Sequence, residues 1–168
     1  MAATESFDIT TGCDLQEVDN AVNQALKELR QRYDFKNVPI DVDFRRADAQ
    51  LVLGAPDEFK LRAMWEVLLA RMTRRGVPVK NLNAGRIEPA AGGRVRMTVT
   101  LQQGLPPETA RAIVKLIKEM KLRKVQAAIQ GDQVRVSSSS RDELQRAIAA
   151  LKERDLGVEL HFGNYRSQ

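Results

Sequence analysis

The sequence predicts an α+β protein made of two similar halves, each with four strands and two helices. Two observations lead to this prediction. Short segments in which apolar and polar residues alternate, as in half-buried strands, are separated by longer segments with apolar residues at helical spacing. The order strand, helix, strand, strand, helix, strand occurs once before residue 92 and again after it, which indicates an internal duplication in architecture.

The composition is that of an ordinary globular protein. The chain has 168 residues, of which 43% are hydrophobic and 29% charged, and this length allows one large core or two small ones. The sequence has no apolar run of membrane-spanning length and no secretory signal pattern, so we expect a cytoplasmic protein without membrane contact. Cys13 is the only cysteine, which excludes an internal disulfide and a cysteine metal cluster, and no cofactor is expected.

The first half opens with an alternating strand and a capped helix. Glu17 follows Asp14 at the spacing of a helix start, and apolar residues then recur up to about Tyr33. Pro39, near the beginning of the next strand, indicates an edge strand. The expected elements are strands at 6–11, 38–44, 50–53 and 77–82, helices at 14–33 and 59–72, and a linker rich in Ala and Gly at 83–93.

The second half contains the clearest pattern in the chain. A strand, the turn Gly131-Asp132 and a second strand form a predicted hairpin, and Ser140 with Glu143 has the spacing of a capping box that begins a helix. The expected elements are strands at 94–101 and 158–162, a hairpin at 124–136, and helices at 106–122 and 141–155.

A βαββαβ unit folds naturally into a four-stranded antiparallel sheet with both helices on one face, the ferredoxin-like arrangement. We therefore expect two ferredoxin-like domains, residues 1–91 and residues 92–168. In a duplicated chain, a terminal strand such as 6–11 can complete the sheet of the other half without any change in pattern. Exchanged terminal strands are thus compatible with the same sequence.

The two halves differ in charge. Residues 1–91 contain 13 Lys/Arg and 14 Asp/Glu, a net charge of −1, whereas residues 92–168 contain 14 and 8, a net charge of +6. Such a difference suggests that the second half meets phosphate, in a nucleotide or a nucleic acid. The alternative is that the basic excess only aids solubility.

The primary candidate site is the open face of the second sheet. Its outward positions hold side chains that donate hydrogen bonds and neutralise phosphate, and this face has no carboxylates in the predicted register. The alternative is an ordinary solvated sheet face. The expected phosphate contacts are Arg94, Arg96, Lys124 and Arg135, and Gln126, Gln130 and Gln133 would contact polar edges of the ligand.

A basic ridge on the helix 106–122 provides secondary candidates. Arg111, Lys115 and Lys118 lie at helical spacing, and Lys121 follows them. Lys115, Lys118 and Lys121 are therefore included as candidate ligand contacts, although a solvated helix face explains them equally well. The outward central-strand positions of the second sheet hold no aromatic residue, which argues against RNA binding by base stacking.

Catalytic patterns are weak. His161 is the only histidine, and no second ligand or partner is near it in sequence. Cys13 precedes a predicted helix, where a thiolate can be stabilised, but no histidine accompanies it. We expect a structural or surface role for both, and the chain is not predicted to be an enzyme.

Several blocks of residues resemble the YajQ family of small bacterial proteins over nearly the full length. They are Ser6–Ile9, Asp14–Asn23, Arg32–Lys36, Asp57–Leu61, Arg75–Val77, Glu88–Ala90, Gly92-Gly93, Ile113–Lys118, Val125–Val136 and Arg141-Asp142. Ser137–Ser140 depart from the basic or glycine residues that the family often has in this turn. The resemblance implies two ferredoxin-like domains in a cytosolic, nucleotide-binding protein, and associates the family with nucleotides, RNA and cyclic di-GMP.

Together these observations predict a non-enzymatic nucleotide-binding protein. The resemblance favours a regulator that responds to cyclic di-GMP or a guanine nucleotide and acts through a protein partner such as a transcription regulator. GTP and ATP are the other nucleotide candidates. The alternative function is general RNA binding, to tRNA or other RNA, or a chaperone-like activity that depends on charge, and an enzyme acting on nucleotides is a third possibility.

Overall fold

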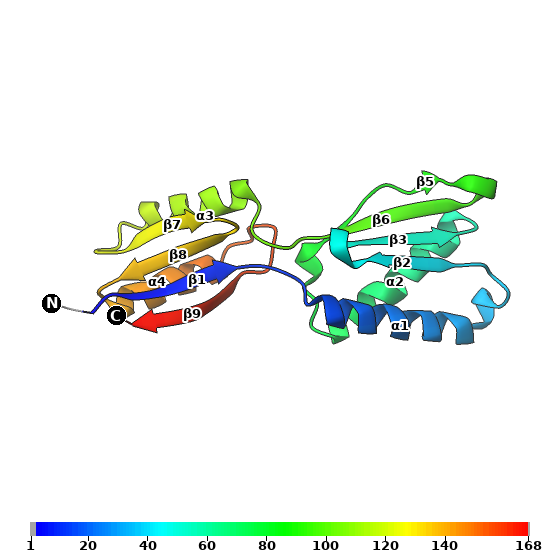
Figure 1. The fold of residues 1–168 in the computed structure, drawn as a ribbon, viewed down its shortest axis with the longest axis horizontal. Helices are drawn as coiled ribbons and strands as arrows, with labels where there is room; N and C mark the ends of the chain where they lie inside the picture. Colours follow the sequence, from blue (N-terminus) through cyan, green and yellow to red (C-terminus); the bar gives the residue numbers. More distant parts are fainter. Residues whose placement is uncertain (1–2, 168) are drawn as a thin grey trace. The chain divides into compact units, whose positions relative to one another are not determined.

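The chain forms two compact units in a computed structural model that describes residues 3–167 (Figure 1). Unit 1 consists of Met1–Gly12 and Gly104–Gln168, and unit 2 consists of Cys13–Gln103. Unit 2 is therefore an insertion in the chain between the first strand of unit 1 and the remainder of that unit. Among the described residues, no helix has the length and apolar character needed to cross a membrane.

Unit 1 is a ferredoxin-like βαββαβ unit. Its four-stranded antiparallel sheet has the order β7-β8-β1-β9, and two helices supply apolar residues to the core on one face. The elements are β1 (Glu5–Thr10), α3 (Pro107–Glu119), β7 (Gln126–Gln130), β8 (Gln133–Ser138), α4 (Arg141–Lys152) and β9 (His161–Ser167).

The alternation in β1 and β8 determines which face of this sheet packs on the helices. Phe7, Ile9, Val134 and Val136 are fully buried against residues such as Ile113 of α3 and Leu144 of α4. The predicted turn and cap are confirmed. Gly131, with φ 61°, occupies the first turn position that favours glycine, and the Ser140 hydroxyl accepts a 3.3 Å bond from the Glu143 amide.

Unit 2 has the same sheet order with a different chain connection. Its antiparallel sheet follows the order β2-β3-β6-β4, and β5 also pairs with β6. The elements are α1 (Leu15–Gln31), β2 (Asp41–Arg45), β3 (Gln50–Ala55), α2 (Glu58–Arg74), β4 (Leu82–Ala84), β5 (Glu88–Pro89) and β6 (Val95–Leu101), with short 3-10 helices at Tyr33–Phe35, Arg46–Asp48, Val79–Asn81 and Ala91–Gly93.

The core of unit 2 also follows from the predicted patterns. Leu51 and Leu53 of β3 are fully buried beneath α1 and α2, whose apolar stripes include Val18 and Met64. The Asp14 carboxylate caps α1 as expected, accepting bonds from the amides of the first turn at 3.0 and 3.3 Å. The edge strand that Pro39 predicted is β2, which ends the sheet.

The first strands of the two sequence halves are exchanged. β1, from the first half, lies between β8 and β9 of unit 1, and β6, the first strand of the second half, lies between β3 and β4 of unit 2. The prediction of two ferredoxin-like sheets is thus confirmed, and the exchange of first strands, which the sequence left open, is present. Each sheet keeps the strand order of the fold because either first strand can fill the same central position.

The exchange moves the domain boundaries away from 1–91 and 92–168. Residues 3–12 belong with the second half, and β6 belongs with the first, so the chain passes twice between units. The Gln103 side chain lies at one of these passages, where it accepts a 2.7 Å bond from the Cys13 amide and donates a 2.9 Å bond to the Cys13 carbonyl. Two contiguous domains were predicted because a sequence pattern identifies a strand but does not show which other strands it pairs with.

Three other expectations differ from the structure. The strand expected at 77–82 begins only at Leu82, after a 3-10 helix at Val79–Asn81. The region 83–93, expected as a linker, lies within unit 2 and contains part of β4, all of β5 and a 3-10 helix. The last strand begins at His161 rather than at Val158, which is buried ahead of the strand. Alternating residues at 158–162 suggested the earlier start, but Val158 and Leu160 pack on the core from a non-strand segment.

Candidate functional site

The unit 1 sheet has one face packed on α3 and α4, and the candidate site lies on its other face. The register of β1 places Asp8 opposite Arg135 of β8 on one side and Gly163 of β9 on the other. Since Phe7 and Ile9 point into the helix-covered core, Asp8 between them points to the uncovered face. We call this surface, which includes Gln126, Gln130, Gln133 and Arg135, the open face.

A buried carboxylate organises the centre of this face. Asp8 is only 4% exposed although it lies on the side of the sheet that faces away from α3 and α4. Arg135 Nε donates to Asp8 Oδ1 at 3.0 Å, Arg166 Nη2 donates to the same oxygen at 3.2 Å, and Asn164 Nδ2 donates to Oδ2 at 2.6 Å. These four residues form the Asp8 cluster, which has two cationic groups and one anionic group.

The electrostatics of the cluster keep Asp8 ionised. Burial opposes ionisation and is the largest single influence on the Asp8 pKa, but the hydrogen bonds from Arg135 and Asn164 and the charges of both arginines together outweigh it. The pKa of Asp8 is therefore below its ordinary value. About a third of each arginine side chain remains exposed, 35% in both cases. The buried Nε of Arg166 has no hydrogen-bond partner among the described residues.

Two hollows lie in this part of unit 1, and residues of the Asp8 cluster line one of them. One of about 270 Å³ lies beside Asp8 and is lined by Thr10, Gln133, His161, Phe162, Gly163 and Asn164. The other, of about 300 Å³, is lined by Thr4, Lys124, Gln126 and Ser137–Ser139. The open face therefore has a concave, polar surface beside the Asp8 cluster, in a form suited to an anionic ligand with hydrogen-bonding edges.

The structure brings together only part of the predicted site. Arg135, Gln126, Gln130 and Gln133 occupy the open face, and Lys124 lies two residues before the start of β7, with φ 60°. The expectation that this face has no carboxylate is wrong, because the exchanged strand β1 places Asp8 beside Arg135.

Arg94 and Arg96 belong to unit 2. Arg94 donates from Nη1 to the Pro39 carbonyl and from Nη2 to Asp41, both at 2.9 Å, and so ties the segment before β6 to the edge strand. Arg96 Nε lies 3.6 Å from a Glu88 carboxylate oxygen. The expectation of a single basic face containing Arg94, Arg96 and Arg135 is therefore wrong, and both unit 2 arginines have acidic partners.

The secondary candidates lie on α3 and at its end. Arg111, Lys115 and Lys118 line a hollow of about 240 Å³ together with Val114 and Ile129. Ile129 is on the core-facing side of β7, so this hollow is separate from the open face. Lys121 follows the helix in a left-handed conformation, with φ 50°.

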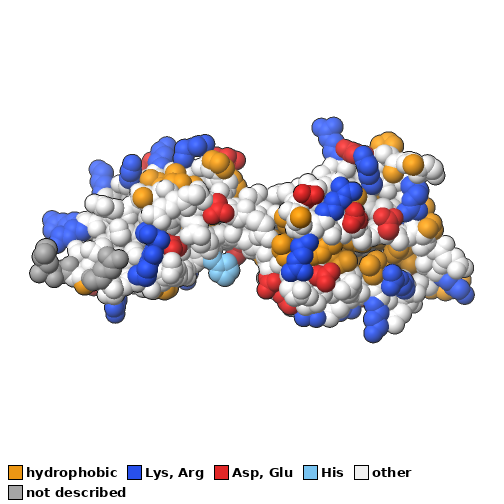
Figure 2. Space-filling view, in the orientation of Figure 1, with side chains coloured by type: hydrophobic (Ala, Val, Ile, Leu, Met, Phe, Trp, Pro, Cys, Tyr) orange, Lys and Arg blue, Asp and Glu red, His pale blue; other side chains and the backbone are white. Residues whose placement is uncertain are grey.

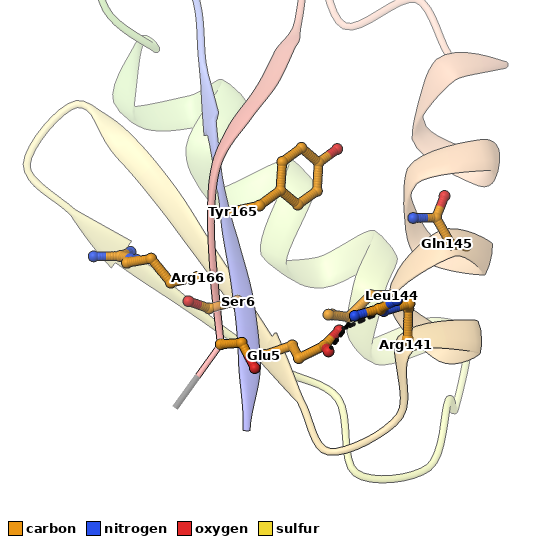
Figure 3. Close-up of a pocket in the computed structure, with 8 residues that line it drawn as sticks. Glu5, Ser6, Arg141, Leu144, Gln145, Tyr165 and Arg166 are labelled. Carbon is orange, nitrogen blue, oxygen red and sulfur yellow. Dashed lines mark hydrogen bonds and ion pairs between the residues drawn. The ribbon is translucent and has the colours of Figure 1, made fainter. Parts of the chain in front are cut away.

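A further hollow in unit 1, of about 350 Å³, lies between β9 and α4 (Figure 3). Tyr165, which is 61% exposed, points toward α4, whereas Arg166 and Ser6 point to the other side of the sheet. Arg141 donates to both Glu5 oxygens, at 3.1 and 2.8 Å. Because Glu5 neutralises this guanidinium, the hollow is a weaker phosphate site than the open face.

Sequence reasoning missed Asp8, Asn164 and Arg166 as parts of the site. Asn164 and Arg166 were overlooked because the last strand was expected to end at Phe162. The available signal for a longer strand was Tyr165, an aromatic residue of a type enriched in strands, three residues after Phe162. Asp8 was assigned to the other half, where no pattern links it to Arg135.

The two residues considered for catalysis have ordinary environments. His161 is exposed at the rim of the 270 Å³ hollow. Burial raises the pKa of the Cys13 thiol to about 11, so the thiol is protonated at neutral pH. The described residues contain no group of three His, Cys, Asp or Glu side chains placed to hold a metal ion.

The charge difference between sequence halves is lost when the strands are exchanged. Unit 1 contains 12 Lys/Arg and 10 Asp/Glu, a net charge of +2, and unit 2 contains 15 and 12, a net charge of +3. Figure 2 accordingly shows Lys and Arg side chains distributed over both units. Local geometry, and not a basic half, therefore distinguishes the candidate site.

The fold and the open face define a tandem ferredoxin-like protein with exchanged first strands and an arginine-bearing, uncovered sheet. A family model described as nucleotide-binding protein YajQ-like matches residues 5–166. The chain belongs to the YajQ family. It is 47% identical over 166 residues to a protein of Chloroherpeton thalassium, and 48% identical over 166 residues to proteins of Alkaliphilus oremlandii and Bacillus cereus. Each alignment covers 99% of this chain and 100% of the relative, and each relative is named a nucleotide-binding protein.

Proposed function

We propose that this chain is a non-enzymatic nucleotide-binding protein whose ligand lies on the open face of unit 1. One observation carries the proposal: two arginines are oriented by a single buried carboxylate on the sheet face that lies away from α3 and α4. The cluster has a net positive charge, and each guanidinium retains exposed surface. Guanidinium groups held in this way bind phosphate oxygens with little loss of side-chain entropy.

The assigned contacts follow from the positions of the side chains. Arg135 and Arg166 would bind phosphate. Lys124 would add a third cation from the hollow of about 300 Å³ near the start of β7. Gln126, Gln130 and Gln133 would hydrogen-bond the polar edges of a base or ribose. The names of the relatives support a nucleotide as the ligand.

Guanine nucleotides, including cyclic di-GMP, are the preferred candidates. Arginine forks match the adjacent acceptors O6 and N7 of guanine, and the site has more donors than acceptors. Binding of such a ligand would regulate contact with a protein partner in the cytoplasm. A non-enzymatic role is supported by the protonated Cys13 thiol. It is also supported by Asp8, the carboxylate in the hollow beside His161, because its oxygens accept hydrogen bonds from Arg135, Asn164 and Arg166.

Calorimetric titration of the full chain tests the assignment. GTP, ATP and cyclic di-GMP would be titrated into the parent, Arg135→Ala and Arg96→Ala. Because Asp8 keeps Arg166 and Asn164 as partners, Arg135→Ala should remain folded while nucleotide affinity falls at least about tenfold, the loss expected for one charged hydrogen bond. Arg96→Ala is the matched control, an arginine on the other sheet with an acidic partner, and should bind as the parent does.

The same titrations discriminate the proposal from RNA binding by charge. A nucleotide sensor should saturate at one ligand per chain and prefer guanine to adenine. A general RNA-binding protein should instead show a steep dependence on salt and little preference among ligands. The proposal fails if Arg135→Ala binds every ligand like the parent, and the site belongs to unit 2 if Arg96→Ala alone loses affinity.

A further inference from the structure

β7 is an edge strand without the features that usually prevent a sheet edge from pairing with another chain. Among the described residues it pairs with β8 alone. Its sequence, Gln126-Ala-Ala-Ile-Gln130, contains neither a charge nor a proline. Natural edge strands commonly carry charges, proline or bulges because an exposed row of backbone N–H and C=O groups otherwise recruits a further strand.

The other sheet edges have such features. β9 carries a register shift opposite Ser6 and Asp8 and has Asn164 at φ 54°. β2 carries Asp41, Asp43 and Arg45. On the opposite side of that sheet, β4 and β5 are only three and two residues long. β7 is therefore the edge best suited to strand addition.

A hollow lies where the inward side chains of an added strand would be placed. The hollow of about 240 Å³ is bounded by Ile129 of β7 and by Arg111, Val114, Lys115 and Lys118 of α3. Ile129 points toward the helical layer yet is 46% exposed, since no further strand covers it. A strand paired with β7 would place alternate side chains beside Ile129 and Val114, with the three cations around them.

We propose that β7 binds an extended peptide segment of a partner protein, in which apolar residues alternate with acidic ones, as an additional strand of the unit 1 sheet. The apolar side chains would cover Ile129 and Val114, and the acidic side chains would pair with Arg111, Lys115 and Lys118. Charge selects this occupant over a second copy of the chain, which would bring the same three cations to the interface.

This surface is distinct from the nucleotide site and does not depend on it. The open face uses the outward side chains of β7, whereas the peptide would use the backbone edge and the inward side chains. Loss of peptide binding with nucleotide binding unchanged, or the reverse, separates the two assignments.

Binding of synthetic peptides to the full chain provides the test. The probe is an acetylated peptide of about ten residues, long enough to span β7, that alternates valine with glutamate. Two further versions of the peptide carry backbone N-methyl groups on alternate residues. One version is methylated at the odd-numbered residues and the other at the even-numbered residues. Since every second residue of an added strand bonds to β7, one N-methylated version should lose binding and the other should retain it. Slower hydrogen exchange at β7 amides should accompany binding.

Charge variants complete the test. Lys115→Glu combined with Lys118→Glu should weaken binding of the glutamate peptide at least about tenfold, through loss of two charge contacts. Arg146→Glu, an exposed arginine on α4 of the same unit, is the control and should have no effect. The proposal is overturned if the glutamate peptide does not bind, or if both N-methylated versions bind like the parent peptide. It is also overturned if a peptide that alternates valine with lysine binds equally well, or if a short RNA displaces the glutamate peptide from this surface.

Discussion

Asp8 shows how a residue that appears unfavourable in the sequence can be central to a site. On a sheet of its own half, this carboxylate would repel phosphate. On the exchanged strand it holds Arg135 and Arg166 at 3.0 and 3.2 Å. The role of the residue is therefore determined by which strand lies beside it.

Replacing Asp8 by alanine should destabilise unit 1. The change leaves two guanidinium groups close together without their shared acceptor, and the free energy of unfolding should fall by about 2 kcal/mol. Asp43→Ala is the control, because Asp43 and its partner Arg45 are 57% and 53% exposed, and it should cost less than about 0.5 kcal/mol. Urea denaturation measures both, and equal effects of the two substitutions would contradict the role given to Asp8.

The same interaction predicts a pH dependence. The Asp8 pKa is lower in the folded state, so its contribution to stability is complete above the unfolded-state pKa of about 3.9 and is lost as the pH falls through the folded-state pKa. Between about pH 5 and about pH 2, the parent should therefore lose more stability than Asp8→Asn. Parallel urea titrations at several pH values measure this difference, and parallel curves for the two proteins would argue against it.

Cys13 should react slowly in the native protein. Burial raises its thiol pKa to about 11, which leaves little thiolate at neutral pH. At about pH 8, alkylation by iodoacetamide should be at least about tenfold slower in the folded protein than in urea. Rates that are equal in the two conditions would show that the thiol is neither buried nor perturbed.

At the scale of elements, α3 ends in a conformation that its sequence does not favour. Lys121 follows the helix with φ 50°, and its amide donates a 3.2 Å bond to the Lys118 carbonyl. Glycine is the preferred residue at this position because a side chain makes the left-handed conformation costly. The connection from α3 to β7 therefore places Lys121 in a backbone conformation that this residue type disfavours.

Lys121→Gly should therefore stabilise the protein by about 1 kcal/mol, the cost of placing a non-glycine residue in the left-handed region. Lys121→Ala removes the same charge but keeps that cost, so it should give no comparable gain. Thermal and urea unfolding of the two variants measure the difference. If both variants bind nucleotide like the parent, Lys121 also loses its place among the secondary ligand candidates.

At the scale of the whole molecule, the exchange of β1 and β6 decides which fragments can fold. Residues 13–103 contain the complete unit 2 sheet and should unfold cooperatively on their own. The fragment 1–91 lacks β6, and the fragment 92–168 lacks β1. In each fragment the first strand that remains carries side chains that pack in the core of the other unit, so neither fragment should fold. Circular dichroism with urea titration distinguishes these outcomes, and cooperative unfolding of 1–91 would contradict the exchanged arrangement.

Most individual elements could be predicted from the sequence because their signals are local. The alternation in β8, the turn at Gly131 and the caps at Asp14 and Ser140 each depend on neighbouring residues, and all are present in the structure. The last strand was misplaced because Val158 alternates as in a strand but packs from a loop. Of the candidate site, Arg135 and the three glutamines were placed correctly on the open face, whereas Arg94 and Arg96 were assigned to the wrong sheet.

The sequence by itself determined the order of the elements and the face that each one buries, because side-chain periodicity is a property of a single segment. Only the tertiary structure decided that β1 lies beside β8 and β6 beside β3, and hence that Asp8 meets Arg135. Two first strands with similar alternation can fill the same position in either sheet. Partner choice depends on packing between segments distant in the chain, which no local pattern records.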